Sequence, residues 1–149
     1  MSYVLGNKSL SELEGVDPGL VATVHRAIQI TPVDFSVHDG IRTLEEQQEY
    51  VDTGVSETLQ SKHLDGLAVD LVPYINGKLR WELDPIYQIA EAVRESARKV
   101  GVRIRWGGCW EELTNNNAYP RVLVDEYILM RQSMGKRPFV DGPHFELIK

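Results

Sequence analysis

Residues 61–78 read SKHLDGLAVDLVPYINGK and contain the signals for a turn, a strand and a hairpin in succession. The largely apolar run LAVDLVPYI at 67–75 predicts a strand. Gly66 allows the chain to fold back just before this strand, and the NGK sequence at 76–78 is typical of a hairpin turn just after it. This stretch therefore favours a small antiparallel sheet that includes residues 67–75.

Helices and further strands are expected on both sides of this stretch. Asp17 followed by Pro18, and Asp84 followed by Pro85, are typical helix starts, and Gly101 is a typical helix end. Before the strand at 67–75 we expect a short helix that starts at the capping box Ser9–Glu12, a helix from Pro18, a strand at 33–37, and a helix from the capping box Thr43–Glu46 to Gly54. After it we expect a helix from Asp84 to Gly101, a strand at 102–106, a polar loop at 111–120, a helix at 121–134 and a strand at 144–149. This order favours an α+β fold over a wound parallel sheet.

Length and composition fit one domain over residues 1–149. The chain is 42% hydrophobic and 26% charged, without internal repeats or a Pro/Ser/Gly linker. Its formal net charge of -6 makes nucleic acid an unsuitable partner, because binding phosphates requires a basic patch. The single cysteine, Cys109, excludes an internal disulfide and a cysteine-rich zinc module.

The N-terminal sequence MSYVLGNKSLSELEG has neither a basic segment nor a long apolar segment. We therefore expect no signal peptide and no membrane insertion, with synthesis in the cytoplasm. If the substrate lies outside the membrane, another protein must give access to it.

The four histidines differ as candidates for chemistry. His63 stands with Asp70 in SKHLDGLAVD, and His144 stands in DGPHFEL, both beside turn residues. His38 lies in an expected strand without a spaced partner, and His25 lies on the polar side of an expected helix. His63 and His144 are thus the better ligand candidates.

Two imidazoles and a carboxylate from His63, Asp70 and His144 would give Zn²⁺ three ligands and leave a fourth position for water. Asp70 lies inside an apolar run, where an ionised carboxylate requires a strong partner. That partner could be a metal, but it could also be Arg42, or Asp70 could cap a turn. Each histidine taken alone could be an ordinary surface or core histidine.

Asp141 and Arg42 are candidates for catalysis. Asp141 precedes His144 by three residues, and Pro143 stiffens the turn between them. Its carboxylate could exchange protons beside a metal, or it could be an ordinary turn aspartate. Arg42 could hold a substrate carboxylate or an oxyanion, or form a surface ion pair with a glutamate.

The segment RWGGCW at 105–110 places two tryptophans around a Gly-Gly turn. These tryptophans could line a cleft or close the core. Cys109 has no histidine partner in sequence, and we interpret it as a small packed residue.

Two patterns connect these residues to a known family. The pattern S-x-H-x-x-G-x-A-x-D is complete in residues 61–70, and the later acid-x-x-His pattern is provided by Asp141 and His144. Together they resemble the LAS-type metallopeptidases, which include D-Ala-D-Ala carboxypeptidases, vancomycin-resistance dipeptidases and L-alanyl-D-glutamate endopeptidases. The fixed positions of the first pattern are Ser61, His63, Gly66, Ala68 and Asp70.

Within that group, the chain is most similar to short endolysins of tailed phages that cleave the L-Ala–D-Glu bond. Their G-x-R-T-x-x-E-Q segment is similar to residues 40–47, and their D-x-P-H-F-E ending is similar to residues 141–146. Asp141 replaces the glutamate usual in the carboxypeptidase and dipeptidase branches, and Glu146 replaces their frequent second histidine. On the same face of a strand as His144, Glu146 could orient a ligand or be an ordinary exposed residue.

The resemblance implies an α+β fold of the D-Ala-D-Ala carboxypeptidase/Hedgehog type, with a central antiparallel sheet flanked by helices. It implies zinc on His63, Asp70 and His144, and Asp141 as the general base. In the expected reaction, Asp141 takes a proton from the attacking water and later protonates the D-Glu amine, while zinc and Arg42 stabilise the oxyanion.

The implied function is hydrolysis of the L-Ala–D-Glu bond of peptidoglycan stem peptides during host lysis by a phage. We expect a monomer, made in the host cytoplasm, that reaches the periplasm or cell wall after another protein permeabilises the membrane. The alternatives are a D-Ala-D-Ala carboxypeptidase of the same family and a non-catalytic, zinc-stabilised module that binds the cell wall.

Overall fold

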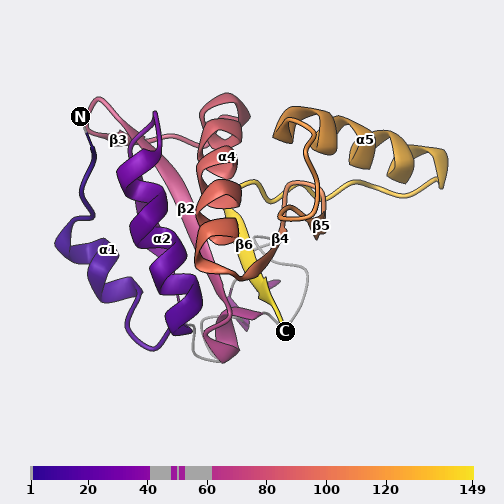
Figure 1. Cartoon of the computed structure of the whole chain (residues 1–149). Coiled ribbons are helices and arrows are strands. Elements are labelled where there is room, and N and C mark those ends of the chain that lie inside the picture. Colours follow the sequence, from indigo (N-terminus) through magenta and orange to yellow (C-terminus); the bar gives the residue numbers. More distant parts are fainter. Residues whose placement is uncertain (1, 41–47, 50, 53–61) are drawn as a thin grey trace.

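An antiparallel sheet forms the centre of the computed structural model, which describes residues 2–40, 48, 49, 51, 52 and 62–149. Its strands lie in the order β1-β2-β6-β4-β5, and β3 extends β2 as a hairpin (Figure 1). The strands are β1 (Phe35–Asp39), β2 (Ala68–Ile75), β3 (Lys78–Leu79), β4 (Arg103–Trp106), β5 (Glu111–Glu112) and β6 (His144–Ile148). The α+β prediction with a small antiparallel sheet is therefore confirmed.

Helices cover one face of this sheet. The long helix α4 (Leu83–Val100) packs across β2 and β4, and α2 (Pro18–Ile30) lies alongside it. The short helix α1 (Asn7–Glu12) packs against β1, and α5 (Pro120–Ser133) packs against α4 at the other end of the molecule. No helix in the described ranges is long and apolar enough to cross a membrane.

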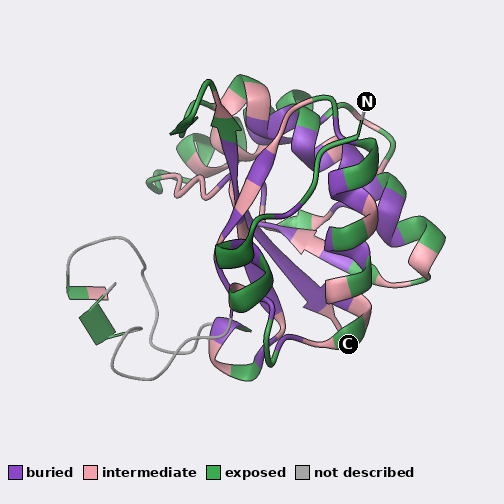
Figure 2. Ribbon diagram, turned by 90° about the vertical axis from the view of Figure 1, so that its left-hand side faces the viewer, coloured by how far each residue is buried: buried purple, intermediate pink, exposed green. Residues whose placement is uncertain are grey.

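Side-chain alternation separates the two faces of the central strands. Val69 and Leu71 of β2, together with Phe145 and Leu147 of β6, belong to the hydrophobic core beneath the helices. The residues between them project from the opposite face, which we call the outer face. Figure 2 shows that buried residues run along the central strands and along the helix surfaces turned toward them.

Local signals in the sequence place the ends of several elements. The Asp17 side chain accepts a hydrogen bond of 2.8 Å from the Gly19 N–H at the start of α2. Gly101 ends α4 in the left-handed conformation, with φ of 91°. Asn76 and Gly77 both have positive φ, as a two-residue hairpin turn requires.

Three predicted local features differ from the structure. Ser9 does not cap α1, because the helix begins at Asn7, and the buried Ser9 hydroxyl instead accepts a hydrogen bond from the Val37 N–H. The first strand begins at Phe35, so Val33 lies outside it. Residues 111 and 112, expected in a loop, form β5 by pairing with β4.

The helix predicted from Thr43 to Gly54 lies mostly outside the described residues. Residues 48, 49, 51 and 52 within it are helical.

Candidate metal centre

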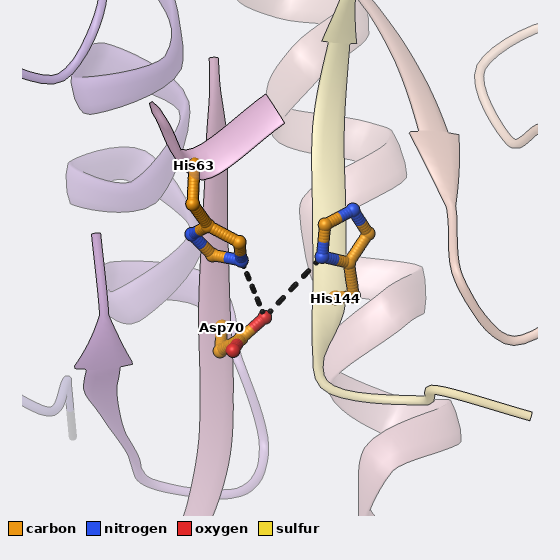
Figure 3. A group of neighbouring side chains, drawn as sticks. All are labelled: His63, Asp70 and His144. Carbon is orange, nitrogen blue, oxygen red and sulfur yellow. Dashed lines mark hydrogen bonds and ion pairs between the residues drawn. The ribbon is translucent and has the colours of Figure 1, made fainter. Parts of the chain in front are cut away.

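Two neighbouring strands and one turn bring His63, Asp70 and His144 together. Asp70 of β2 and His144 of β6 are direct partners across the antiparallel pair, so both side chains project from the outer face. His63 lies in the 3-10 helix η1 (Lys62–Asp65), just before β2. Figure 3 shows the Asp70 carboxylate between the two imidazole rings.

The turn before β2 depends on Gly66. This residue has a φ of +70°, a conformation that side chains disfavour. A Cβ at this position would also lie 2.5 Å from the carbonyl oxygen of Gly15. The predicted fold-back at Gly66 is confirmed, and it carries His63 over Asp70.

The side chains are close enough to share one ion. Asp70 Oδ1 lies 3.1 Å from Nε2 of His63 and 3.4 Å from Nδ1 of His144. One ligand atom from each of the three residues lies within 4.8 Å of the others. The sequence prediction that these residues meet is therefore confirmed, and together they form a possible metal-binding site.

Hydrogen bonds on the far side of each ring determine which nitrogen faces this site. His63 Nδ1 lies 2.6 Å from the carbonyl oxygen of Gly40, to which it can only donate, so Nε2 is the ring nitrogen that faces Asp70. His144 Nε2 lies 2.9 Å from Glu146 Oε1, which leaves Nδ1 toward Asp70. Such hydrogen bonds orient histidine ligands in metalloproteins.

The ionisable groups of the site shift one another's pKa values. Burial alone would raise the pKa of the Asp70 carboxyl, but the charges and hydrogen bonds of His63 and His144 hold it well below its usual range. Burial alone would lower the pKa of His144, but the hydrogen bonds that its ring donates to Asp70 and Glu146, with the charges of Asp70 and Asp141, raise this pKa to about 9. The Asp70 carboxylate is thus stabilised by the two imidazole rings beside it, a role that a bound metal ion could also fill.

The donor set fits a zinc ion of the catalytic type. Two imidazole nitrogens and one carboxylate oxygen supply three protein ligands and leave a coordination position open. His63 is fully buried and His144 is 6% exposed. Such buried rings with fixed orientation are suited to holding a metal rather than to titrating in solvent.

Glu146 is the orienting partner that the sequence left undecided. It lies on the same face of β6 as His144, as expected, and is only 5% exposed. Of the two alternatives left open for Glu146, the ordinary exposed residue is therefore excluded, and its carboxylate contacts the His144 ring.

Asp141 lies at the entrance to β6, beside the three-residue group. Its N–H donates to the Gly107 carbonyl at 2.9 Å, and its carbonyl accepts a hydrogen bond of 3.1 Å from the His144 N–H. Its charge acts on the His144 ring, although it is not one of the three residues that could share the ion. The role of Asp141 as a carboxylate beside a metal stays a prediction.

The two tryptophans of residues 105–110 have different surroundings. Trp106 is fully buried in the core and stacks on Phe145. Trp110 is half-buried, and its ring centroid lies 5.3 Å from that of His144 and 6.2 Å from that of Phe139. Trp110 therefore lines the site, and Trp106 closes the core. Each of the two roles predicted for this segment applies to one of its tryptophans.

The other candidates from the sequence are Arg42, His25, His38 and Cys109. Arg42, the predicted oxyanion residue, is outside the described residues. His25 is exposed on α2, and His38 packs edge-on against Trp81, with ring centroids 5.3 Å apart. Cys109 is 2% exposed, and burial raises the pKa of its thiol, in agreement with a packed residue.

Comparison with known proteins connects this geometry to one family. The sequence profile for phage L-alanyl-D-glutamate peptidases matches residues 1–148. The chain belongs to the phage L-alanyl-D-glutamate peptidase family. It is therefore a peptidase, and the resemblance inferred from its motifs is confirmed.

Individual relatives agree with this assignment. The L-alanyl-D-glutamate peptidase of Escherichia phage T5 is 31% identical over 152 residues, which cover 99% of this chain and all of that protein. The enzyme of the same name from Listeria phage A118 is 29% identical over 84 residues, 56% of this chain and 29% of that protein. The crystal structure of the Serratia marcescens L-Ala D-Glu endopeptidase ChiX superposes with a TM-score of 0.73 at 36% identity, covering 97% of this chain and 90% of the other.

Proposed function

We propose that this peptidase is a zinc enzyme that hydrolyses the L-Ala–D-Glu bond of peptidoglycan stem peptides and acts as a phage endolysin in host lysis. The observation that carries the proposal is the cluster of His63, Asp70 and His144, with Asp141 beside it, in a member of this family. Relatives named for cleavage of this bond support the choice of substrate.

His63, Asp70 and His144 would hold the zinc ion. When bound, zinc supplies a Lewis acid that activates water and polarises the scissile carbonyl. Gly40 and Glu146 keep the two imidazoles oriented toward the ion by hydrogen bonds on their far sides.

Asp141 would move the protons. Its carboxylate accepts a proton from the attacking water and later donates one to the amine of D-Glu as the peptide bond breaks. The fixed backbone around Asp141 supports this role, because hydrogen bonds to Gly107 and His144 hold its position relative to the ligands.

Arg42 would stabilise the oxyanion. Support for this role comes from its place in residues 40–47, a segment similar to the arginine-containing motif of phage endolysins.

The role of an endolysin implies where the enzyme is made and where it acts. The enzyme would be made in the host cytoplasm and reach the peptidoglycan once another protein has permeabilised the membrane. A single peptide stem is the whole substrate of one active site, so we propose that the enzyme works as a monomer.

Product analysis tests this proposal. Purified, zinc-loaded protein is incubated with peptidoglycan, with and without a zinc chelator, and the products are identified by mass spectrometry. We expect peptides that begin with D-Glu and glycan strands that end in L-Ala, both abolished by chelation. Release of free D-Ala alone would indicate a carboxypeptidase, and binding without any product would indicate a non-catalytic wall-binding module.

A further inference from the structure

Arg105 lies next to the metal centre on the outer face of the sheet. It is the direct partner of Glu146 across the β4–β6 pair, whereas the next pair, Trp106 and Phe145, points into the core. Its Nη1 lies 3.6 Å from Glu146 Oε2, and the other oxygen of that carboxylate contacts His144. One glutamate side chain therefore separates the guanidinium from a candidate zinc ligand.

The Arg105 guanidinium is anchored but still open to solvent. Its Nε donates a hydrogen bond of 2.9 Å to the Trp110 carbonyl, and its Cζ lies 5.1 Å from the centroid of the Trp110 ring. The side chain nevertheless remains 43% exposed. These contacts fix the plane of the guanidinium and leave part of its hydrogen-bonding edge available to a ligand.

Arg103, two residues earlier on the same face, is used differently. Its Nε and Nη2 both donate to the Glu112 carboxylate, at 3.2 and 2.6 Å. The Glu112 carboxylate thus pairs with two guanidinium nitrogens of Arg103. Arg105, in contrast, contacts one oxygen of Glu146 at a longer distance. Arg103 is therefore a matched control for any test of Arg105.

The surroundings of Arg105 favour an anionic ligand. The chain has a net charge of -6, and the site holds several carboxylates. Arg105 and Lys62 are positive groups that both act on Glu146. These cations would offset the repulsion between the site's carboxylates and an anionic group of the substrate.

The proposed substrate offers one carboxylate close to the reacting bond. Where the stem peptide continues through the side-chain carboxyl of D-Glu, the α-carboxylate of that residue stays free. It is attached to the carbon that carries the scissile amide nitrogen. It must therefore lie a short distance from the zinc ligands when the bond is cleaved.

We infer that Arg105 binds the free α-carboxylate of the D-Glu residue and makes the enzyme select D-Glu over its α-carboxamide. This inference rests on the proposed function, because it assigns a specificity residue to the same site. Arg105 contacts Glu146 and Trp110 in the free enzyme and would present its remaining N–H groups to the substrate.

The test compares two synthetic substrates that differ in one group. The first is acetyl-L-Ala-D-Glu-L-Lys, linked through the D-Glu side-chain carboxyl, and the second carries an α-carboxamide in place of the α-carboxylate. We expect wild-type kcat/KM to favour the carboxylate by roughly ten- to a hundredfold, as for loss of a charge-assisted hydrogen bond. In Arg105→Gln this ratio should fall to within about threefold of unity, and Arg105→Lys should be intermediate.

Three outcomes decide the matter. A ratio lost in Arg105→Gln but kept in Arg103→Gln supports the inference. A purely structural role for Arg105 would lower kcat/KM for both substrates equally, and an unchanged ratio in Arg105→Gln would overturn the inference while leaving the proposed function intact. If the wild-type enzyme cleaves neither substrate after L-Ala, the proposed function fails, and the inference fails with it.

A binding measurement gives a readout independent of turnover. The product D-Glu-L-Lys, with or without the α-carboxamide, is titrated into zinc-loaded wild-type and Arg105→Gln protein by calorimetry. We expect the carboxylate to bind more tightly only in the wild type, with zinc content equal in both proteins. Equal affinities for the two products in the wild type would contradict the assignment.

Discussion

Nε2 of His144 lies 2.9 Å from Oε1 of Glu146, two residues later on the same face of β6, and both side chains are buried. This contact leaves Nδ1 of His144 toward Asp70. Glu146 therefore supports the candidate metal centre without belonging to the group that could share the ion.

Removing this carboxylate should weaken zinc binding. In Glu146→Ala we expect the zinc dissociation constant to rise roughly 10- to 100-fold, because partners that orient a histidine ligand have effects of this size. Competition with a chromophoric chelator measures the constant. Glu112 is a carboxylate on β5 that pairs with Arg103, and Glu112→Gln is the control. This variant should bind zinc as tightly as the wild type does. Wild-type affinity in Glu146→Ala would show that the contact is not needed for the metal.

His63→Ala should abolish stoichiometric zinc binding. The substitution removes one of three ligands and leaves the buried Gly40 carbonyl without the ring nitrogen that contacts it. Metal analysis after dialysis against a low concentration of zinc measures the stoichiometry. His25→Ala removes an exposed histidine from α2 and is the matched control. A full equivalent of zinc in His63→Ala would exclude His63 from the ligand set.

Asp141→Asn should keep zinc and the fold but lose turnover. The amide preserves the shape of the side chain and cannot accept the proton of the attacking water, so we expect kcat to fall by about 10²- to 10⁴-fold. Product formation from peptidoglycan is compared at equal zinc content and equal melting temperature. Turnover close to that of the wild type would remove Asp141 as the general base.

The sequence predicts the centre of this fold better than its edges. The run at 67–75 is largely apolar and HFELIK at 144–149 is a short strand pattern, both next to distinctive turns, and only glycine fits the φ of Gly66 and its contact with Gly15. These local patterns bring His63 over Asp70, whereas His144 is added by the joint motif pattern and the family resemblance, because it meets Asp70 only through the pairing of β2 with β6.

Pairing between distant segments is not visible in a single sequence. Ser9 fits a capping box, but its hydroxyl is used by Val37, which lies 28 residues away in the chain. Strand β5 consists of two glutamates without apolar alternation, and it exists because β4 supplies a partner. The roles of Gly40 and Trp110 at the site likewise depend on tertiary contacts with His63 and His144.

Gly107→Ala should disturb both stability and activity. A Cβ at this position would lie 2.4 Å from the Asp141 carbonyl oxygen and 2.9 Å from the His144 Cβ. We expect the free energy of unfolding to fall by about 1–3 kcal/mol, as for other overpacked sites, and turnover to fall as Asp141 and His144 shift. Gly6→Ala, where a Cβ meets nothing within 4 Å, should retain both properties. Denaturant titration measures the free energy of unfolding, and product analysis measures turnover. Wild-type values of both in Gly107→Ala would show that the backbone accommodates the added Cβ.

Asp17→Ala should destabilise the protein in a pH-dependent way. The hydrogen bond from the Gly19 N–H, reinforced by Lys149, lowers the pKa of the Asp17 carboxyl below its ordinary value of 3.8. A carboxyl whose pKa is lowered by folding stabilises the protein fully above its unfolded-state pKa, and this contribution is lost as the pH falls through the folded-state pKa.

We therefore expect Asp17→Ala to lower the free energy of unfolding by about 1 kcal/mol at pH 7, a typical cost of removing a helix N-cap. The difference from the wild type should shrink in acid, below the ordinary carboxyl pKa of 3.8. Asp17→Ser retains a capping oxygen without a titratable group, so its stability relative to Asp17→Ala should not change over this range. Denaturant titrations at several pH values measure all three proteins. If the difference in free energy of unfolding between Asp17→Ala and the wild type does not depend on pH, even in strong acid, the ionised carboxylate does not contribute to the cap.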